Sequence, residues 1–565
     1  MKKIVFIFML FSLWLFAMPQ AIVQEIQKSG IAKKDLSIYI KEAGNGGKVV
    51  ASLNAGKTRT PASVIKVLTT YAALLKLGFE YRWPTQFYTT GRLKKGVLNG
   101  DLLVKGFGDP SLNDRDLADI VATIRAKGIR KIRGKIVIDR SYFKVGNRDN
   151  SGFDNHTYSA YNAMPDAMMF NERVSTVCVT PNKRDVYKKN DDGSYKVIDK
   201  LKYVNKACKG KYSWPGVKIE KNEVMPTVIL KGSISKRCGK RNVRNVLTKP
   251  YKSFYYALKE KLRQEGIQIR GKLELKKIPK EAKVLFTYYS DTLESIVSKT
   301  AKKSNNLYAR HLLLLLGAKV YGAPATLQKG RDAISKVLRS KGALGYGTLM
   351  VDNGSGLSRI AKMTAKNLAD MYDNAYDRYG NRWMQTLSIA GIDGTIKRRF
   401  RHTTVKKRAW MKTGTLKRVK NIGGYVKNKA GKLYTVVIMV NSTRARYHGA
   451  KLQNEIIKWL SKRTAKPRKK PITSIVKAER ASVKKESVQR VSSTTQRYYI
   501  QVGSFQEMPN QKYLKKIEAL NLRYSVRNRG KYRVLIGAYK HKSDAVKALD
   551  RVRSTVNKGA FIVKL

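Results

Sequence analysis

The sequence has 565 residues, too many for one ordinary hydrophobic core, and therefore predicts about two to four domains. Hydrophobic residues make up 42% of it, which excludes a wholly disordered chain. With 116 Lys and Arg against 39 Asp and Glu, the formal net charge is +77, which implies an anionic partner and makes nucleic acid the first candidate.

The N-terminal residues argue against nucleic acid. Lys2 and Lys3 precede the apolar run 4–16, and small or turn-forming residues follow around 17–21. This order is typical of a cleaved signal peptide, here residues 1–21, and the alternative is an uncleaved membrane anchor. We therefore expect a protein outside the cytoplasm, whose anionic partners are cell-wall polymer, carboxylate-bearing peptides or an anionic membrane surface.

Two short strands, 36–42 and 48–53, and then a core helix are predicted next. Thr60 is the expected N-cap of this helix, Pro61 its first residue and Gly78 the residue past its end. This placement puts the residues that follow Pro61 in the first turn of the helix.

Residues 88–285 have the pattern of a β-rich insertion, because short apolar or alternating runs lie between turn residues. Helices are expected within it at 114–127 and 253–265. Beyond the insertion, helices and a hairpin are predicted: helices at 292–317, 361–378 and 448–461, and strands at 419–427 and 432–441.

The C-terminal part begins with a basic segment, 462–495, which holds eleven Lys or Arg, two Glu and no aromatic residue. It cannot bury enough apolar surface to fold, so it is a disordered linker, either a basic tether on an anionic wall or a plain solvated spacer. In residues 496–565, the strand patterns Tyr499–Phe505 and Tyr532–Tyr539 repeat, each followed by a helical segment. The full order, strand-helix-strand-strand-helix-strand, predicts a ferredoxin-like sandwich.

The three cysteines are Cys178, Cys208 and Cys238. In an oxidising compartment they allow one disulfide and leave one thiol, and the sequence does not decide which two pair. Neither they nor the five scattered histidines have metal-ligand spacing, so we expect no metal and no cofactor.

Three short motifs carry the predicted chemistry, and the first is Ser63 with Lys66. Their spacing at the start of a helix places both side chains on one face. A serine hydroxyl needs a base to act as a nucleophile, and a lysine in a cationic, partly desolvated pocket can have a pKa low enough to serve. The helix N-terminus adds N–H groups suited to a developing oxyanion. Alone, this motif is common by chance in a lysine-rich chain.

The second motif is Ser304-Asn305-Asn306. Ser304 would relay a proton between Lys66 and a leaving amine, and Asn306 would hydrogen-bond a substrate amide and Lys66. The alternative is a simple turn or helix cap, for which Ser and Asn are favoured.

The third motif is Lys412-Thr413-Gly414-Thr415, expected on a sheet edge. Lys412 and Thr413 would bind a terminal carboxylate, and Gly414 would let a substrate backbone approach closely. The N–H of Thr415 would form an oxyanion hole together with that of Ser63.

The three motifs, S-x-x-K, S-x-N and K-T-G in this order, resemble those of penicillin-binding proteins and serine β-lactamases. The sequence around these motifs resembles the D-alanyl-D-alanine carboxypeptidase/endopeptidase family of class C penicillin-binding proteins over residues 22–461. The segments that carry the resemblance are 61–63, 106–112, 304–309, 352–359, 391–395 and 412–416. The separation of Ser63 and Ser304, 304 − 63 = 241 residues, also fits the large insertion of this family, which β-lactamases lack. Phe107 departs from the family, which usually has Gly there.

The resemblance implies an α+β fold in which residues 22–87 and 286–461 form a β-lactamase-type, transpeptidase-like catalytic domain and 88–285 the insertion. It implies a serine-type D-Ala-D-Ala carboxypeptidase, with DD-endopeptidase as a further activity, that acts on peptidoglycan stem peptides through an acyl-enzyme on Ser63. β-Lactams would inhibit it. Residues 496–565 resemble a SPOR domain, which implies binding to denuded glycan strands in the periplasm and enrichment at the division septum.

Three alternatives remain open. A catalytically inert septal glycan-binding protein would need no turnover, and the intact motifs argue against it. A serine β-lactamase is disfavoured by the insertion and by the lack of an evident deacylating Glu motif. A nucleic-acid binder fits the charge alone.

Overall fold

In the computed structural model the chain divides into two compact units, residues 1–469 and 470–565. The structure describes residues 18–145, 153–190, 192–222, 225–345, 349–464, 498–506, 509, 511–520, 522, 524–528, 532–539, 542–557 and 559–564. Most of the expected signal peptide (1–21) and linker (462–495) lies outside these residues, and both stay predictions. Among the described residues, no helix is long and apolar enough to cross a membrane.

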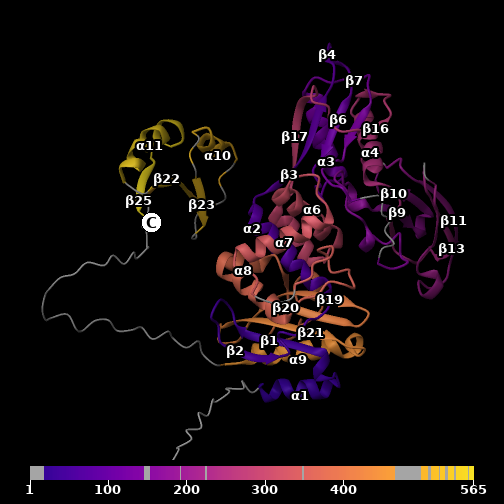
Figure 1. Cartoon of the computed structure of the whole chain (residues 1–565). Helices are drawn as coiled ribbons and strands as arrows, with labels where there is room; N and C mark the ends of the chain where they lie inside the picture. The colour runs from indigo at the N-terminus through magenta and orange to yellow at the C-terminus, as the bar shows by residue number, and fades with distance from the viewer. Residues whose placement is uncertain are drawn as a thin grey trace, which may run out of the picture. The chain divides into compact units, whose positions relative to one another are not determined.

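A six-stranded antiparallel sheet forms the centre of the first unit (Figure 1). Its strands are β1 Leu36–Glu42, β2 Val49–Leu53, β18 Ser388–Ile389, β19 Ala409–Leu416, β20 Val419–Lys427 and β21 Leu433–Asn441. The order is β18-β19-β20-β21-β1-β2, so β1 lies against β21, with Leu36 opposite Val440. Alternation along β1 sends Ile38 into the core on one face of the sheet and Tyr39 to the core on the other.

Helices cover both faces of this sheet (Figure 1). On one face α1 (Gln20–Ser29) and α9 (Ala445–Lys462) bury Ile22 and Leu452 in a shared core. The other face carries a helical layer: α2 (Lys66–Leu77), α5 (Leu293–Lys302), α6 (Asn306–Tyr321), α7 (Leu327–Ser340) and α8 (Ala365–Gln385). Because burying one Leu or Ile side chain is worth about 1.5–3 kcal/mol, these two cores hold the sheet between them.

The first unit differs from the sequence-based expectations at three points. The helix expected over 292–317 is two helices, because the chain turns at Ser304, whose φ of +54° does not occur within an α-helix. Thr60 is not an N-cap: a 3₁₀ turn, Ala62–Ile65, precedes α2 without any side-chain cap, and the N–H of Thr60 donates to Asn441 instead. Helices α1 and α7 have no counterpart in the prediction.

The insertion leaves and rejoins this fold through two paired strands, β3 (Arg82–Thr89) and β17 (Lys283–Thr292). The boundaries expected at 88 and 285 fall inside this pair, and the division into domains stays a prediction. The two expected helices are present, as α3 (Asp114–Ala126) and α4 (Pro250–Gln264). β3 and β17 belong to a five-stranded sheet of order β16-β8-β6-β3-β17, with β6 Leu102–Gly106, β8 Ile136–Asp139 and β16 Leu273–Leu275. A separate four-stranded sheet has the order β15-β7-β5-β4, with β4 Arg92–Lys94, β5 Val97–Asn99, β7 Lys131–Ile132 and β15 Gln268–Ile269.

Two three-stranded sheets form a distal lobe within the insertion. Their strands are β9 Ser175–Thr180, β10 Asp185–Lys188, β11 Lys196–Val204, β12 Gly216–Glu220, β13 Thr227–Ser235 and β14 Arg241–Asn245. The orders are β10-β9-β14 and β11-β13-β12, and the two sheets share one small core. A disulfide joins Cys208 to Cys238 and leaves Cys178 as a buried thiol, which settles the pairing that the sequence left open.

The second unit has the predicted strand-helix-strand-strand-helix-strand order. Its elements are β22 Tyr498–Phe505, α10 Gln511–Glu518, β23 Tyr524–Asn528, β24 Tyr532–Tyr539, α11 Lys542–Thr555 and β25 Phe561–Lys564. The antiparallel sheet has the order β23-β24-β22-β25, in which the repeat strands β22 and β24 are neighbours. Ile500 and Ile536 from these strands lie in its core.

Candidate active site

Ser63 and Lys66 lie side by side at the junction between the 3₁₀ turn and α2. The turn holds Ser63, and Lys66 is the first residue of the helix, with no exposed surface. The Lys66 ammonium nitrogen lies 2.7 Å from Ser63 Oγ and 2.7 Å from Asn306 Oδ1, and it also donates to the carbonyl of Ser355. The expected shared face is therefore present, and three oxygen atoms converge on one buried amine.

Burial lowers the pKa of Lys66 well below its usual value, and the nearby charges of Lys412 and Arg310 lower it further. A neutral lysine amine has two N–H groups and one lone pair. With the N–H groups on Asn306 Oδ1 and the Ser355 carbonyl, the lone pair is left for the Ser63 hydroxyl. The arrangement can thus remove the Ser63 proton without another base.

The second motif lies in the turn between α5 and α6. Ser304 occupies this turn with its positive φ, and Asn305 caps α6 by accepting a hydrogen bond from the N–H of Tyr308. The helix-cap alternative therefore applies to Asn305, whereas Asn306 points its Oδ1 at Lys66 and donates from Nδ2 to the Tyr161 carbonyl at 3.0 Å. Ser304 Oγ accepts from Lys412 at 3.0 Å.

The third motif lies on β19, at the expected sheet edge. The short strand β18 pairs no further than Met411, so no strand in the described part of the chain pairs with this edge from Lys412 onward. Lys412 is fully buried, donates to Ser304 Oγ and to the Thr413 carbonyl at 2.7 Å, and burial lowers its pKa to about 7. The Thr413 hydroxyl donates to Thr395 at 2.9 Å. All three motifs therefore meet around Ser63.

Gly414 makes a close approach that the sequence did not predict. A β-carbon at this position would lie 2.8 Å from the Pro61 carbonyl oxygen and 3.0 Å from the Ser63 nitrogen. The glycine thus lets β19 pack directly against the backbone of the nucleophile turn. Asn421 on β20 fixes the same turn by donating to the carbonyls of Thr60 and Pro61, both at 2.9 Å. The approach of a substrate backbone at Gly414 stays a prediction.

Sequence reasoning missed the role of the 352–356 loop. Ser355 provides a carbonyl to Lys66, and Gly354 provides one to the Thr69 hydroxyl at 2.8 Å. A β-carbon on Gly356, which has a φ of +74°, would lie 2.0 Å from the Ala62 carbonyl oxygen, so only glycine fits this position. Gly354 and Gly356 were the sequence signal available for this loop. The partner atom is a backbone carbonyl, which no residue type identifies.

The insertion contributes a wall of the site. Glu172 accepts from the Tyr308 hydroxyl at 2.9 Å and from Asn305 Nδ2 at 3.3 Å, and so holds the Ser304 turn. A cavity of about 720 Å³ opens between the insertion and the end of β19. Residues of both charges line it: Thr60, Phe153, Asp154, Tyr161, Leu357, Ser358, Arg359, Leu416, Lys417, Arg418 and Val419.

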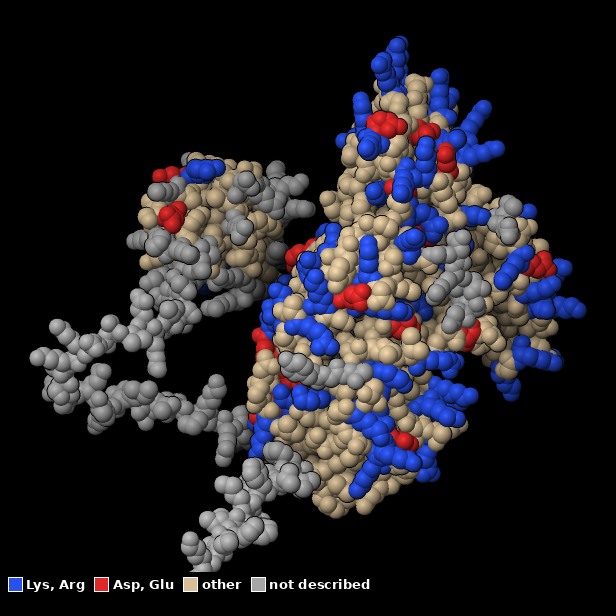
Figure 2. Space-filling view, in the orientation of Figure 1, with Lys and Arg blue, Asp and Glu red and all other residues tan. Residues whose placement is uncertain are grey.

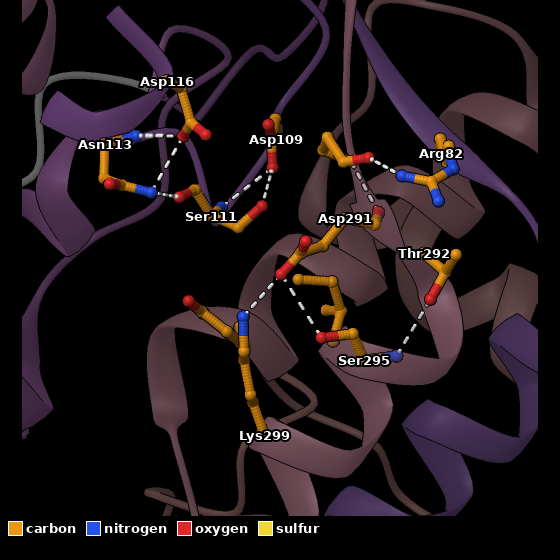
Figure 3. Close-up of polar contacts among 12 residues, drawn as sticks. Arg82, Asp109, Ser111, Asn113, Asp116, Asp291, Thr292, Ser295 and Lys299 are labelled. Atoms are coloured by element: carbon orange, nitrogen blue, oxygen red, sulfur yellow. Dashed lines mark hydrogen bonds and ion pairs between the residues drawn. The ribbon is translucent and has the colours of Figure 1, made fainter. Parts of the chain in front are cut away.

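Figure 3 shows two sets of polar contacts, one around Asp109 in the insertion and one around Asp291 at the start of α5. Asp109 accepts from the N–H and hydroxyl of Ser111, at 2.8 and 2.7 Å, and burial raises its pKa to about 7. Asp291, just before α5, pairs with Lys299 at 2.6 Å (Figure 3). Ser295 in the first turn of α5 donates from its N–H to Thr292 and from its hydroxyl to Asp291, both at 3.3 Å, so the last residues of β17 anchor the start of the helix that leads to Ser304.

Comparisons with known proteins identify the family of this chain. The model of the D-Ala-D-Ala carboxypeptidase 3 (S13) family matches residues 18–463, and the SPOR domain model matches residues 494–564. D-alanyl-D-alanine carboxypeptidase DacB of Haemophilus influenzae is 27% identical over 424 residues, which cover 71% of this chain and 85% of that one. D-alanyl-D-alanine carboxypeptidase of an Actinomadura species is 27% identical over 403 residues, covering 68% and 74%.

Solved structures show the same fold. Penicillin-binding protein 4 from Haemophilus influenzae superposes with a TM-score of 0.67 at 24% identity, covering 78% of this chain and 99% of that one. Its complex with a β-lactam gives a TM-score of 0.63 at 23% identity. Because the family model matches more than half of the 565 residues, the chain belongs to the D-Ala-D-Ala carboxypeptidase 3 (S13) family, is a serine hydrolase of that type and carries a C-terminal SPOR domain.

Proposed function

We propose that Ser63 is the nucleophile of this carboxypeptidase and Lys66 its base. Lys66 takes the hydroxyl proton, and Ser63 Oγ bonds to the carbonyl carbon that precedes the terminal D-alanine. The N–H groups of Ser63 and Thr415 would hold the resulting oxyanion. The supporting observation is the convergence of Ser63, Asn306 and the Ser355 carbonyl on the buried amine of Lys66.

Ser304 would pass a proton to the leaving amine. The C–N bond breaks as the amine takes the proton that left Ser63, relayed from Lys66 through Ser304. Water then hydrolyses the acyl-enzyme and restores Ser63. Lys412 and Thr413 would hold the terminal carboxylate of the substrate, and the hydrogen bond from Lys412 to Ser304 supports their closeness to this relay.

Peptidoglycan stem peptides are the proposed substrate, and cross-linked peptides a second one. The cavity beside β19 offers Asp154 together with Arg359 and Arg418, which suit a peptide that bears both amino and carboxyl groups. A β-lactam would acylate Ser63 and stay, because its leaving group remains tethered. Cleavage of cross-links would add DD-endopeptidase activity.

The ends of the chain support a proposed location in the periplasm. Residues 1–21 would direct export and be removed, and 462–495 would tether the catalytic unit to the SPOR domain, 496–565. That domain would bind denuded glycan strands and concentrate the enzyme at the division septum. The net charge of +77 supports a further contact with an anionic membrane surface.

Mass spectrometry after exposure to penicillin tests the proposal. We expect the adduct on the peptide that contains Ser63, and an unmodified Ser63 peptide in folded protein would overturn the assignment. Turnover of a D-Ala-D-Ala peptide by wild type that persists in Ser63→Ala would contradict it equally. If neither wild type nor Ser63→Ala turns over the peptide but both bind sacculi, the inert glycan-binding alternative would be favoured.

A further inference from the structure

One sheet of the distal lobe exposes an array of lysines. In the β11-β13-β12 sheet, the side chains of β13 alternate, and Val228, Leu230 and Ile234 face the core of the lobe. On the opposite face Ile229 and Ser235 of β13 are buried, whereas Lys231 and its neighbours on β11 and β12 are exposed. We call this exposed part the lysine face and define it by five residues: Ile198, Lys200 and Lys202 of β11, Lys218 of β12 and Lys231 of β13.

The strand register places like charges next to one another on the lysine face. Lys200 lies opposite Lys231, and like charges in opposed positions destabilise a sheet. Lys218 is paired with Glu220 at 2.8 Å, and Lys200 acts on the same carboxylate from further away. Within the described residues no carboxylate forms an ion pair within 4.0 Å with Lys200, Lys202 or Lys231. An anionic partner would remove this repulsion.

The surroundings do not neutralise the lysine face. Residues 196–245 contain 14 Lys or Arg and 3 Asp or Glu, so their net charge is 14 − 3 = +11. Lys and Arg side chains predominate in Figure 2 on the side of the first unit where Figure 1 places β11 and β13. The field at this end of the molecule therefore attracts anions from several directions.

The shape of the array favours a surface over a single polymer chain. Lysines repeat along β11 at about 7 Å and across to β13 at about 5 Å, so they cover an area and do not line a groove. Ile198 lies among them on the same face and is 42% exposed. An aliphatic side chain gains nothing from a hydrated polyanion, but it does gain from the boundary between lipid headgroups and acyl chains.

We propose that the lysine face docks the enzyme on an anionic lipid surface. The ammonium groups of Lys200, Lys202 and Lys231 would contact lipid phosphates, and Ile198 would enter the headgroup layer. This inference deepens the membrane contact proposed above and rests on the periplasmic location. It does not depend on the chemistry at Ser63, so the two can fail separately.

Co-sedimentation of the full chain with vesicles tests the docking surface. Phosphatidylglycerol-rich vesicles are compared with phosphatidylcholine vesicles, so that any insertion of the apolar N-terminal run appears in both. The test variant is Lys200→Gln/Lys202→Gln/Lys231→Gln. Each neutralised lysine should lower the partition coefficient about fivefold, or about a hundredfold for all three, at low salt. Turnover of a soluble D-Ala-D-Ala peptide should not change.

A charge-matched control removes the same three charges elsewhere. Lys94, Lys127 and Lys131 are exposed lysines in another part of the insertion, and the triple Gln variant there should bind vesicles within about twofold of wild type. An equal loss in both triple variants would show that net charge alone matters and would overturn the proposal.

Ile198→Asn separates a lipid surface from a soluble polyanion. We expect it to weaken vesicle binding several-fold and to leave binding to dextran sulfate unchanged, because only the lipid offers an apolar boundary. Unchanged vesicle binding by Ile198→Asn, together with weaker dextran sulfate binding by the lysine-face variant, would assign this face to a polyanionic polymer and refute lipid docking. Thermal unfolding of each variant verifies that the lobe is folded.

Discussion

Replacing Gly414 by alanine tests whether close packing of β19 positions the nucleophile. The new β-carbon would lie 2.8 Å from the Pro61 oxygen, 2.9 Å from the Val64 nitrogen and 3.0 Å from the Ser63 nitrogen. Ordinary contact begins near 3.4 Å, so the strand and the turn must separate by 3.4 − 3.0 = 0.4 Å to 3.4 − 2.8 = 0.6 Å. All three atoms belong to the backbone, so no side chain can rotate away to make room.

The separation should affect acylation more than stability. A misplacement of about 1 Å can cost about a hundredfold in rate, so we expect Gly414→Ala to slow acylation by a fluorescent penicillin about ten- to a hundredfold. Overpacking should cost about 1–3 kcal/mol of unfolding free energy. Gly56→Ala is the control, because a β-carbon there meets nothing within 4 Å. Acylation of a folded Gly414→Ala protein at the wild-type rate would refute the positioning argument.

Three further predictions follow from charge and cross-linking. Because the pKa of Lys412 is lowered to about 7, its positive charge is lost as the pH rises above 7, so KM for a peptide with a free terminal carboxylate should rise there; a flat KM from pH 6 to 9 would contradict this. Burial raises the pKa of Asp109 from 3.8 to about 7, so the free energy of unfolding of wild type should fall as the pH rises from about 4 to 7. In Asp109→Asn this fall should be absent, and urea unfolding above pH 7 should show a difference in the fall of up to about 4 kcal/mol between the two proteins. Replacing Cys208 and Cys238 by serine opens a cross-link between residues 30 apart and should cost the distal lobe about 3–4 kcal/mol, seen by thermal unfolding, while peptide turnover stays unchanged.

Regular patterns in the sequence predicted the elements well where the residues alone determine the structure. Strand β1 and the hairpin β20–β21 follow from alternating apolar residues and a turn, and β1 and β20 have the expected bounds. The repeat Tyr499–Phe505 and Tyr532–Tyr539, with the segments around it, predicted the order of helices and strands along the second unit for the same reason. The motifs also identified side chains that the fold brings together, from Ser63 to Lys412.

The remaining features depend on contacts between distant segments. The turn at Ser304 requires a positive φ in a residue that usually avoids it, and the surrounding contacts, including Glu172 on the Asn305 side chain, impose it. The Ser355 carbonyl next to Lys66 is a backbone atom and has no sequence signal. The choice of Cys208 with Cys238 depends on the parallel pairing of β11 with β13, which brings the residues after Val204 and Ser235 together and which spacing alone does not determine.

The pairing of β1 with β21 has a consequence for the order in which the protein can assemble. Leu36 finds its partner Val440 only after some 400 intervening residues exist, and until then one edge of β1 is open. The central sheet therefore cannot close until β21 has emerged from the ribosome or from a translocation channel. A polypeptide built this way can stay unfolded enough to pass through a channel until nearly its whole catalytic part has been translocated. Its catalytic centre would then form only after translocation.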